Sequence, residues 1–313
     1  MRVMITGANG QVGRALLKSV PTDVEAIRRT REELDVGDIQ SVMGSIQSQR
    51  PDLIINAGAY TAVDKAESEP QLAERANTTG PHNLAVAAAA TGARLLHLST
   101  DFVFDGMASR PYATDAPTNP QSTYGRTKRG GEEAVQRVLP GRSVVLRTAW
   151  VYAAKGNNFL RTMLRLMAAK GAVRVVADQI GTPTAAQPLA EVIWALAARP
   201  DVNGTYHWTD AGVASWYDFA VAIAEESAAI GLLPAEVRVD AIATEDYPTP
   251  ARRPSYSVLD KRSLLAQLSV PPAGDSLPAG DSLADRSVVA NRSVAARHWR
   301  TNLRAVLKEI SHA

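Results

Sequence analysis

The chain has no cysteine among its 313 residues, which excludes disulfide bonds and thiolate metal sites. It also lacks an apolar run near the ~20 residues that a membrane-spanning helix needs. No charge of one sign dominates, because 34 Lys and Arg against 32 Asp and Glu leave a net charge of +2. This balance indicates neither nucleic-acid nor membrane binding. Since no signal-peptide pattern precedes the first strand-like run, we expect a cytoplasmic protein.

The composition is that of a globular protein. Apolar residues make up 45% of the chain and charged residues 21%. At 313 residues the chain can form one large domain or two modest ones, each with its own core.

The chain opens with a strand, a glycine-rich turn and a helix. A β-rich run at 2–6 leads to Gly7, Gly10 and Gly13, and a helix-like segment follows at 14–18. Glycines permit a tight turn and let a pyrophosphate approach the backbone at the start of a helix. The spacing G-x-x-G-x-x-G in this context predicts nucleotide binding rather than a plain strand-to-helix turn.

The residues after the second predicted strand, 23–27, bear on the choice of cofactor. The end of this strand faces the adenosine ribose, where an acid suits NAD and an arginine suits a 2′-phosphate. Arg28 follows and no acid comes directly after Ile27, which favours NADPH, although a solvated basic loop explains the arginines nearly as well. Further on, Asp35, followed by Val36, is placed to accept from the adenine amino group.

Strands and helices alternate through the first half of the chain. Further strands are expected at 52–56, 94–98 and from 144, with a long helix at 71–90 that Pro81 kinks or divides. Such alternation predicts an α/β fold with a doubly wound, Rossmann-like parallel sheet. Ligands on such sheets bind beyond the carboxyl ends of the strands, so one rim should carry the glycine turn, 59–61, Thr100 and Trp150.

Thr100, Tyr124 and Lys128 have the chemistry of a carbonyl reductase. Tyr and Lys four residues apart lie on one face of a helix, and an ammonium beside a phenol lowers the phenol pKa. Such a Tyr can exchange a proton with a carbonyl or an alcohol. Thr100 ends a buried strand and can bond the same oxygen. By itself the Tyr–Lys spacing fits an ordinary helix better, and the glycine turn is what favours catalysis.

The second half of the chain has shorter, mixed elements. We expect a dinucleotide-binding domain at 1–150 and a smaller α+β substrate domain at 151–313 that partly threads back to the first. The sequence Pro-Ala-Gly-Asp-Ser-Leu occurs twice in tandem, from Pro272 and from Pro278. Short tandem repeats of this composition predict a flexible surface insertion at about 270–295.

Several motifs together resemble the extended short-chain dehydrogenase/reductases, and within them the family of dTDP-4-dehydrorhamnose reductases. The resemblance covers most of the chain and fails in the repeat insertion. The motifs that carry it are Thr-Gly-Ala-Asn-Gly-Gln-Val-Gly from Thr6, Ala-Tyr-Thr-Ala-Val-Asp-Lys-Ala-Glu from Ala59, Ser-Thr-Asp-Phe-Val-Phe-Asp-Gly from Ser99, Tyr-Gly-Arg-Thr-Lys from Tyr124, Arg-Thr-Ala-Trp-Val-Tyr from Arg147, Gly-Asn-Asn-Phe from Gly156 and Asp-Gln-Ile-Gly-Thr-Pro-Thr from Asp178.

The resemblance implies NAD(P)H-dependent reduction of the 4-keto group of dTDP-4-dehydro-6-deoxy-L-mannose to dTDP-L-rhamnose. Tyr124 would be the general acid, Lys128 would lower its pKa and bind the nicotinamide ribose, and Thr100 would bind the keto oxygen. The cofactor would carry the hydride chemistry.

The resemblance also implies contacts to both ligands. The cofactor contacts would come from the turn and the path across the sheet edge: Gly7, Gly10, Gln11, Val12, Gly13, Ala59, Tyr60 and Thr61. The substrate contacts would be Asp101, Trp150, Asp64 and Arg253, the last two for a sugar hydroxyl and the diphosphate. A core position at a domain junction suits Trp150 equally well. Asn157 and Asn158 are better read as helix caps.

Other functions remain open. A nucleotide-sugar dehydratase needs an Asp-Glu pair after the Thr, and Phe102 stands where that Glu would be. A nucleotide-sugar epimerase uses the same Tyr–Lys pair. A reductase-like regulatory subunit of methionine adenosyltransferase is the non-catalytic alternative. The resemblance allows a homodimer and a magnesium site. The sequence places no metal, and Glu191 is the ligand considered for it.

Overall fold

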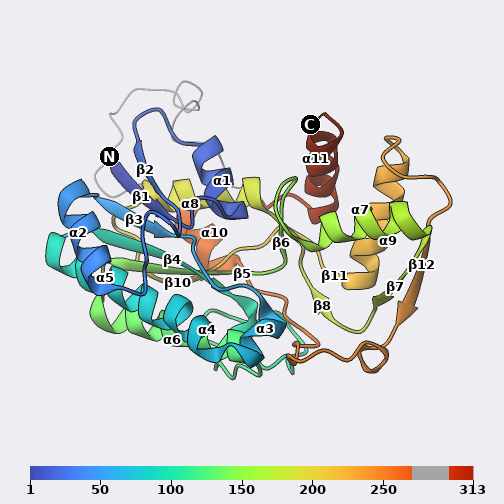
Figure 1. The fold of residues 1–313 in the computed structure, drawn as a ribbon, viewed down its shortest axis with the longest axis horizontal. Coiled ribbons are helices and arrows are strands. Elements are labelled where there is room, and N and C mark those ends of the chain that lie inside the picture. The colour runs from blue at the N-terminus through green and yellow to red at the C-terminus, as the bar shows by residue number, and fades with distance from the viewer. Residues whose placement is uncertain (270–295, 313) are drawn as a thin grey trace.

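The computed structural model describes residues 1–269 and 296–312, so the predicted repeat insertion lies outside the described residues. A six-stranded sheet in the order β10-β5-β4-β3-β1-β2 forms its centre, and every pair in it is parallel (Figure 1). Its strands are β1 (Arg2–Thr6), β2 (Glu25–Arg29), β3 (Leu53–Asn56), β4 (Arg94–Thr100), β5 (Ser143–Thr148) and β10 (Gly204–His207). The strand order reverses at β1, next to β3, which confirms the doubly wound α/β fold.

Helices cover both faces of this sheet because its buried strands are apolar on both sides. Met4, Ile54 and Leu95 point into a cluster with α2, α5 and α6, while Val3 and Ile5 point into one with α1 and α8. Figure 1 shows α1 and α8 above the sheet and α5 and α6 below it. These helices are α1 (Gln11–Lys18), α2 (Ile39–Gln49), α5 (Gly80–Thr91), α6 (Thr123–Val138) and α8 (Ala186–Ala197).

The long helix predicted at 71–90 is divided. Short helices α3 (Val63–Ser68) and α4 (Pro70–Glu74) precede a π-helical turn, Arg75–Thr79, and α5 starts directly after it. Pro81 lies in the first turn of α5, directly after the π-helical turn, where the winding of the continuous helix changes. The turn buries Asn77, which holds the loop after β3.

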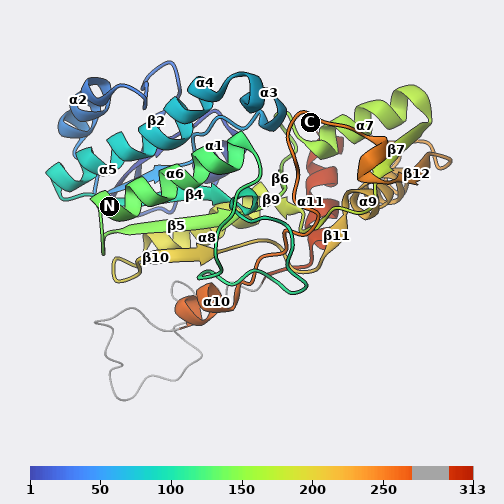
Figure 2. The same cartoon turned by 90° about the horizontal axis from the view of Figure 1, so that it is seen from below.

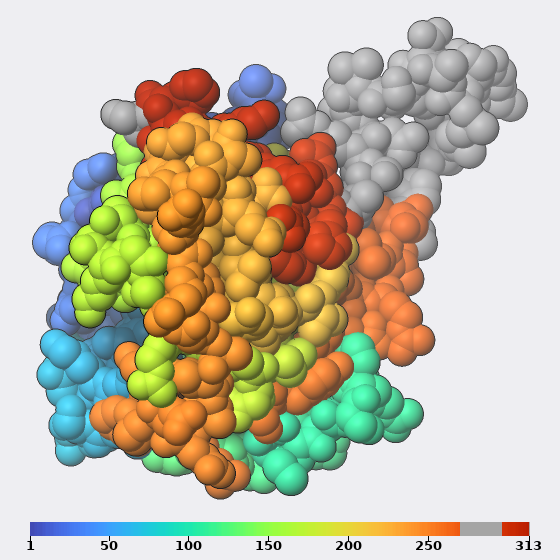
Figure 3. Space-filling view, turned by 90° about the vertical axis from the view of Figure 1, so that its right-hand side faces the viewer, coloured from blue at the N-terminus to red at the C-terminus, as the bar shows by residue number. Residues whose placement is uncertain are grey.

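A second group of elements follows β5. It contains β6 (Val151–Tyr152), α7 (Phe159–Lys170), β7 (Ala172–Val176), β8 (Ile180–Gly181), β9 (Thr184–Ala185), β11 (Ala214–Ser215), α9 (Trp216–Ala228), β12 (Arg238–Ile242) and α11 (Trp299–Ser311). Their apolar side chains share one core, and Figure 3 views the surface where α7, α9 and α11 lie together. As predicted from the sequence, Asn158 caps α7: its side-chain oxygen accepts from the Arg161 N–H at 3.0 Å.

The second half of the chain also contributes to the first core. Helix α8 packs against the sheet, β10 pairs with β5, and α10 (Arg262–Ser269) buries Leu264 in the same cluster. Figure 2 shows α8 and α10 on the side of the sheet opposite α5 and α6, with α7, α9 and α11 beyond one end of the sheet. A domain boundary at residue 150 stays a prediction. No helix in the described residues has the length and apolarity to cross a bilayer.

Candidate active site

Thr100 and Tyr124 meet at the end of the central sheet. Thr100 is the last residue of β4, and Tyr124 lies in the first turn of α6, whose N-cap Ser122 accepts from the Gly125 N–H at 3.1 Å. The Phe102 ring stands edge-on to Tyr124, with centroids 5.5 Å apart. Burial raises the pKa of Tyr124 to about 12, and the hydrogen bond between Tyr124 and Thr100 acts in the opposite direction. The phenol is therefore protonated at neutral pH.

Lys128 lies one turn further along α6 and is buried. Its Nζ donates to the Leu98 carbonyl at 2.6 Å and lies 3.5 Å from His97 Nε2. Burial lowers the pKa of Lys128 to about 8, although the nearby carboxylate of Glu132 acts to raise it. Lys128 was expected to lower the pKa of Tyr124. In the structure this pKa is raised instead, because burial of the phenol outweighs the hydrogen bond with Thr100 and the Asp101 charge acts in the same direction as burial.

Asp101 follows Thr100 directly and is fully enclosed. Its Oδ1 accepts from the Thr100 hydroxyl at 3.0 Å, while its Oδ2 has no hydrogen-bond partner within the described part of the chain. Burial raises the pKa of Asp101 to about 6, against the opposing effect of the Ser257 and Thr100 hydroxyls. A buried, unpartnered oxygen next to the candidate acid is suited to a sugar hydroxyl.

Thr148 was missed by the sequence analysis. It ends β5 and is paired in register with Thr100, so the two threonines are direct neighbours across the sheet. Its Oγ1 is buried without a partner among the described residues. Only the pairing of β4 with β5 places Thr148 beside Thr100, and the pairing of two distant segments cannot be seen in the sequence.

The glycine turn between β1 and α1 leaves backbone close to backbone. Gly7 has a left-handed φ of 67°, and a Cβ there would lie 2.5 Å from Gly58 Cα. A Cβ on Gly13 would lie 2.3 Å from the Gly7 carbonyl oxygen. Gly10 is the N-cap of α1 and has no side chain that could bond to the helix. The first N–H groups of α1 are therefore open to an anion. The turn fits the diphosphate of a dinucleotide.

The side chains of Gln11 and Val12 serve packing. Gln11 Oε1 accepts from Asn158 Nδ2 at 2.7 Å, and Val12 packs against the sheet cluster. Their contribution to a diphosphate would therefore come from the backbone.

The residues expected at the adenosine end lie at the surface. Arg28 pairs with Glu33 at 3.1 Å, and Asp35 pairs with Arg75 at 2.5 Å. The Arg75 hydrogen bond lowers the pKa of Asp35, so this carboxylate is already engaged. Val36 lies below, partly buried in the cluster around α5.

The loop after β3 is held by its backbone. The Tyr60 N–H donates to Asn77 Oδ1 at 2.8 Å, and the Tyr60 carbonyl accepts from Asn77 Nδ2 at 3.1 Å. The Tyr60 hydroxyl bonds to Glu69, which raises the phenol pKa. Ala59 and Thr61 on either side are exposed. An exposed loop at this rim suits the predicted cofactor path.

Trp150 follows β5 in a left-handed conformation with a φ of 49°. Its ring stacks on Trp216 with centroids 3.5 Å apart, and a Cβ on Gly181 would fall within 2.6 Å of it. This strained residue lies between the end of β5 and Trp216, which packs against the second core.

Asp64 and Arg253 lie together although 189 residues separate them. The guanidinium donates to both carboxylate oxygens, at 3.1 and 2.8 Å. Both residues were expected to contact the substrate. In the structure, Asp64 and Arg253 form an ion pair with each other.

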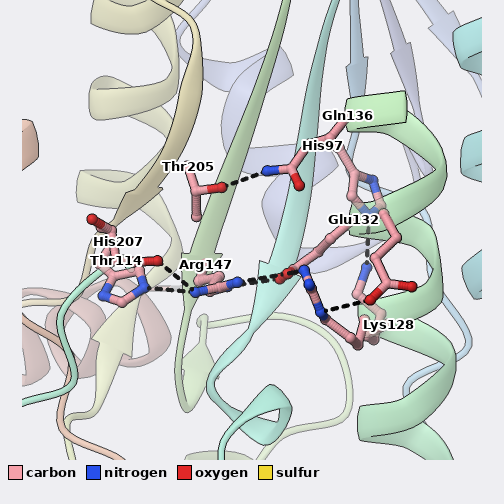
Figure 4. A network of polar contacts seen from close by, with 10 residues as sticks. His97, Thr114, Lys128, Glu132, Gln136, Arg147, Thr205 and His207 are labelled. Carbon is pink, nitrogen blue, oxygen red and sulfur yellow. Dashed lines mark hydrogen bonds and ion pairs between the residues drawn. The ribbon is translucent and has the colours of Figure 1, made fainter. Parts of the chain in front are cut away.

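Below the catalytic turn of α6 lies a buried ion pair. Arg147 binds both oxygens of Glu132, at 2.8 and 2.7 Å, and also reaches the Thr114 carbonyl and His207 (Figure 4). Burial and the Arg147 charge lower the pKa of His207 to about 3, so that ring is neutral. The pair anchors α6 to β5 and so fixes where Tyr124 and Lys128 lie.

No metal site is evident in residues 1–269 and 296–312, because no three His, Asp or Glu side chains there form a cluster. Glu191 is an exposed residue of α8. The magnesium ion stays unplaced.

The comparison with protein families decides which proteins this chain groups with. The model of the RmlD substrate binding domain matches residues 1–276, most of the chain. The chain belongs to the RmlD family. This makes it an oxidoreductase of nucleotide-sugar and polysaccharide biosynthesis.

Individual RmlD-family relatives agree. The chain is 37% identical to the spore coat polysaccharide biosynthesis protein SpsK of Bacillus subtilis, over 100% of this chain and 99% of that one. It is 41% identical to dTDP-4-dehydrorhamnose reductase of Burkholderia thailandensis, over 86% of this chain and 94% of that one. The crystal structure of dTDP-4-dehydrorhamnose reductase from Bacillus anthracis in complex with NADP matches with a TM-score of 0.85 and 33% identity, covering 98% and 99% of the two chains.

Proposed function

We propose that this RmlD-family chain is an NADPH-dependent reductase that converts dTDP-4-dehydrorhamnose into dTDP-L-rhamnose. The observation that carries the proposal is the contact of Thr100 with Tyr124 at the end of β4, on the same sheet rim as the glycine turn. The relatives named dTDP-4-dehydrorhamnose reductase support the substrate.

The cofactor would be held by the backbone of the glycine turn and the exposed loop at Ala59–Thr61. NADP in the Bacillus anthracis relative supports the phosphorylated form, and Arg28 at the end of β2 is suited to a 2′-phosphate. NADH remains the weaker choice. When bound, the nicotinamide supplies the hydride.

The residues of the chain would handle the proton. The hydroxyls of Thr100 and Tyr124 hydrogen-bond the keto oxygen and stabilise the negative charge that develops on it. Tyr124 then gives its proton to that oxygen, and its raised pKa ensures that the proton is present at neutral pH. Lys128, with a pKa of about 8, would supply the proton that restores the phenol, by way of a water or ligand hydroxyl between the two side chains.

The substrate would be positioned around this centre. The free oxygen of Asp101 would accept from a sugar hydroxyl, and Trp150 would contact the sugar ring. Arg253 would bind the diphosphate and exchange part of its contact with Asp64 for it.

A second candidate is another nucleotide-sugar reductase or epimerase. Full-length similarity to SpsK, a spore coat polysaccharide protein, favours it over the non-catalytic subunit. An epimerase would retain bound NAD and show no net consumption of reduced cofactor. A regulatory subunit would bind methionine adenosyltransferase and turn over neither cofactor nor sugar.

The test is a spectrophotometric assay with dTDP-4-dehydrorhamnose and either NADPH or NADH. The wild type should oxidise NADPH, and Tyr124→Phe should lose at least about 100-fold in kcat while still binding NADPH. Tyr247→Phe is the matched control, because Tyr247 is 60% exposed and far from α6 in sequence. Equal rates for wild type and Tyr124→Phe would refute the assigned acid. A cytoplasmic location and a homodimer stay predictions.

A further inference from the structure

A chain of buried polar groups runs beneath the candidate site from β1 to α6. The Thr6 hydroxyl donates to Asn56 Oδ1 at 2.8 Å, and the Gly58 N–H donates to the same oxygen at 3.2 Å. Asn56 Nδ2 lies 3.0 Å from His97 Nδ1, and His97 Nε2 lies 3.5 Å from Lys128 Nζ. The four residues that this network links through their side chains are at most 2% exposed: Thr6, Asn56, His97 and Lys128.

The Gly58 N–H determines which atoms donate and which accept in the hydrogen bonds of this network. A backbone N–H can only donate, so the Gly58 contact identifies the Asn56 atom facing it as the oxygen. The amide nitrogen of Asn56 then faces His97 and donates to Nδ1. A neutral imidazole with an accepting Nδ1 carries its proton on Nε2. Burial and the Lys128 charge hold the pKa of His97 well below its ordinary value, so the ring is neutral.

The Nε2–H of His97 therefore points at Lys128 Nζ, and Figure 4 marks the contact between the two side chains with a dashed line. An ammonium has no lone pair, whereas a free amine can accept this hydrogen bond. The Leu98 carbonyl accepts from Lys128 in either state. Among the charged groups around Lys128, Glu132 favours the ammonium, but two arginines already bind its carboxylate. Tyr124 on the same helix is neutral at pH 7.

We propose that His97 is a positioning residue of the reductase site, held by Asn56 as the Nε2–H tautomer so that Lys128 releases its proton readily. This inference rests on the proposed function. After Tyr124 has protonated the alkoxide, a water or ligand hydroxyl between the two side chains gives a proton to the phenolate and takes one from Lys128. An N–H bond of Lys128 thus breaks and the O–H bond of Tyr124 forms again. The resulting amine accepts from His97 Nε2–H until solvent restores the ammonium.

The first test reads the tautomer in the ligand-free protein and needs no substrate. Long-range 1H–15N spectra of the 15N-histidine-labelled chain show which ring nitrogen carries the proton, and His97→Gln assigns the signal. We expect a protonated Nε2 and a bare Nδ1, with no titration between pH 8 and pH 5. A protonated Nδ1, or titration near ~6.5, the ordinary histidine value, would overturn the inference. Either result stands whatever sugar the enzyme reduces.

The second test follows the basic limb of the pH profile of kcat. His97→Asn can still accept from Asn56 but no longer reaches Lys128, and the limb should move upward by about one unit. Asn56→Asp should act in the same direction, because a carboxylate draws the imidazole proton to Nδ1 and leaves Nε2 as an acceptor for the ammonium. His298→Asn is the control, because this exposed histidine at the N-cap of α11 makes no contact with Lys128, and its substitution should leave the limb in place.

The inference would be contradicted if His97→Asn folds and the basic limb of its kcat profile stays in place or moves to lower pH. If the wild type reduces none of the sugars offered, the proposed function fails by itself. The pKa of Lys128, read from 13C-methylated lysine spectra of wild type and His97→Asn, then decides: a rise in the variant supports the inference, and an unchanged value refutes it.

Discussion

Thr100 and Thr148 face one another at the carboxyl ends of β4 and β5, paired in register. The Thr100 hydroxyl donates to Asp101, whereas the buried Thr148 hydroxyl has no partner within residues 1–269 and 296–312. A buried hydroxyl without a hydrogen bond costs free energy of folding. Its position beside Thr100 is where the proposed keto sugar would bind, and the sugar would supply the missing partner.

Thr148→Val should therefore weaken catalysis without weakening the fold. We expect kcat/KM for the sugar to fall about tenfold, the value of one hydrogen bond of ~1.4 kcal/mol, and the free energy of unfolding to stay or rise. Steady-state kinetics and urea unfolding measure both.

The control for that substitution lies at the other end of the same strand. Ser143 is buried and donates to the Leu139 carbonyl at 2.9 Å. Ser143→Ala should cost about 1 kcal/mol of stability and leave kcat/KM unchanged. A Thr148→Val protein with normal kinetics would remove this residue from the site.

Asp101 should destabilise the protein at neutral pH. Its pKa is about 6 in the folded chain and about 3.9 when unfolded, so folding favours the protonated form. The penalty is present above pH 6 and disappears as the pH falls towards 4. Asp101→Asn should raise the free energy of unfolding at pH 7 by up to about 3 kcal/mol and flatten its pH dependence in that window. It should also lower kcat/KM.

Asp105 should have the opposite effect on stability, because its pKa is lowered in the folded chain. Its carboxylate accepts from the Met107 N–H and the Tyr112 hydroxyl, which lower its pKa. Asp105→Asn should destabilise the protein at pH 7. Equal effects of the two substitutions on unfolding would show that burial of Asp101 is not what sets its pKa.

The Glu132–Arg147 pair should govern acid stability. Arg147 opposes the effect of burial and holds the pKa of Glu132 below its ordinary value, so the pair's contribution is complete above ~4.3 and is lost as the pH falls through the folded pKa. Glu132→Gln should cost about 3 kcal/mol at pH 7, because it leaves Arg147 buried without its counter-charge. Denaturant unfolding from pH 3 to pH 7 measures this.

Glu133 offers the matched surface change on the same helix. It is 55% exposed and pairs with Arg129, so Glu133→Gln should change stability by less than about 1 kcal/mol. A small loss for Glu132→Gln as well would mean that Arg147 finds other partners and does not anchor α6.

Arg253→Ala should raise the KM for the nucleotide sugar about tenfold or more and leave kcat within about threefold, since a diphosphate contact acts in binding rather than chemistry. Arg262→Ala is the control, because its guanidinium is 89% exposed and pairs with Asp260. An unchanged KM in Arg253→Ala would restrict this arginine to its partnership with Asp64.

The parts of the site predictable from sequence are those built by neighbours in the chain. The glycine turn follows β1 directly, and the Tyr124–Lys128 spacing is set by one helix. Thr148 and Asn56 could not be found this way, because their roles depend on strand pairing between distant segments. The sequence predicted a lowered pKa for Tyr124, whereas the structure raises it. The Tyr124–Lys128 spacing indicates a positive charge on the same helix face, but it does not show that the phenol is buried.

The fold shows the same division. Alternating strands and helices predicted the sheet, and the second half of the chain was expected to thread back to the first. That β10 pairs with β5 could not be predicted, because a local pattern indicates a strand but not its partner. The π-helical turn at 75–79 was likewise hidden, although Pro81 pointed to an interruption.

Transfer of a labelled hydride tests the central claim most directly. The chain is mixed with dTDP-4-dehydrorhamnose and NADPH deuterated at carbon 4 of the nicotinamide, and the product is read by NMR. A reductase of the proposed kind places one deuterium on carbon 4 of the sugar, in a product identified as dTDP-L-rhamnose, and Tyr124→Phe yields almost none. Product without deuterium, or an epimerised sugar formed while NADPH stays unconsumed, would contradict the account.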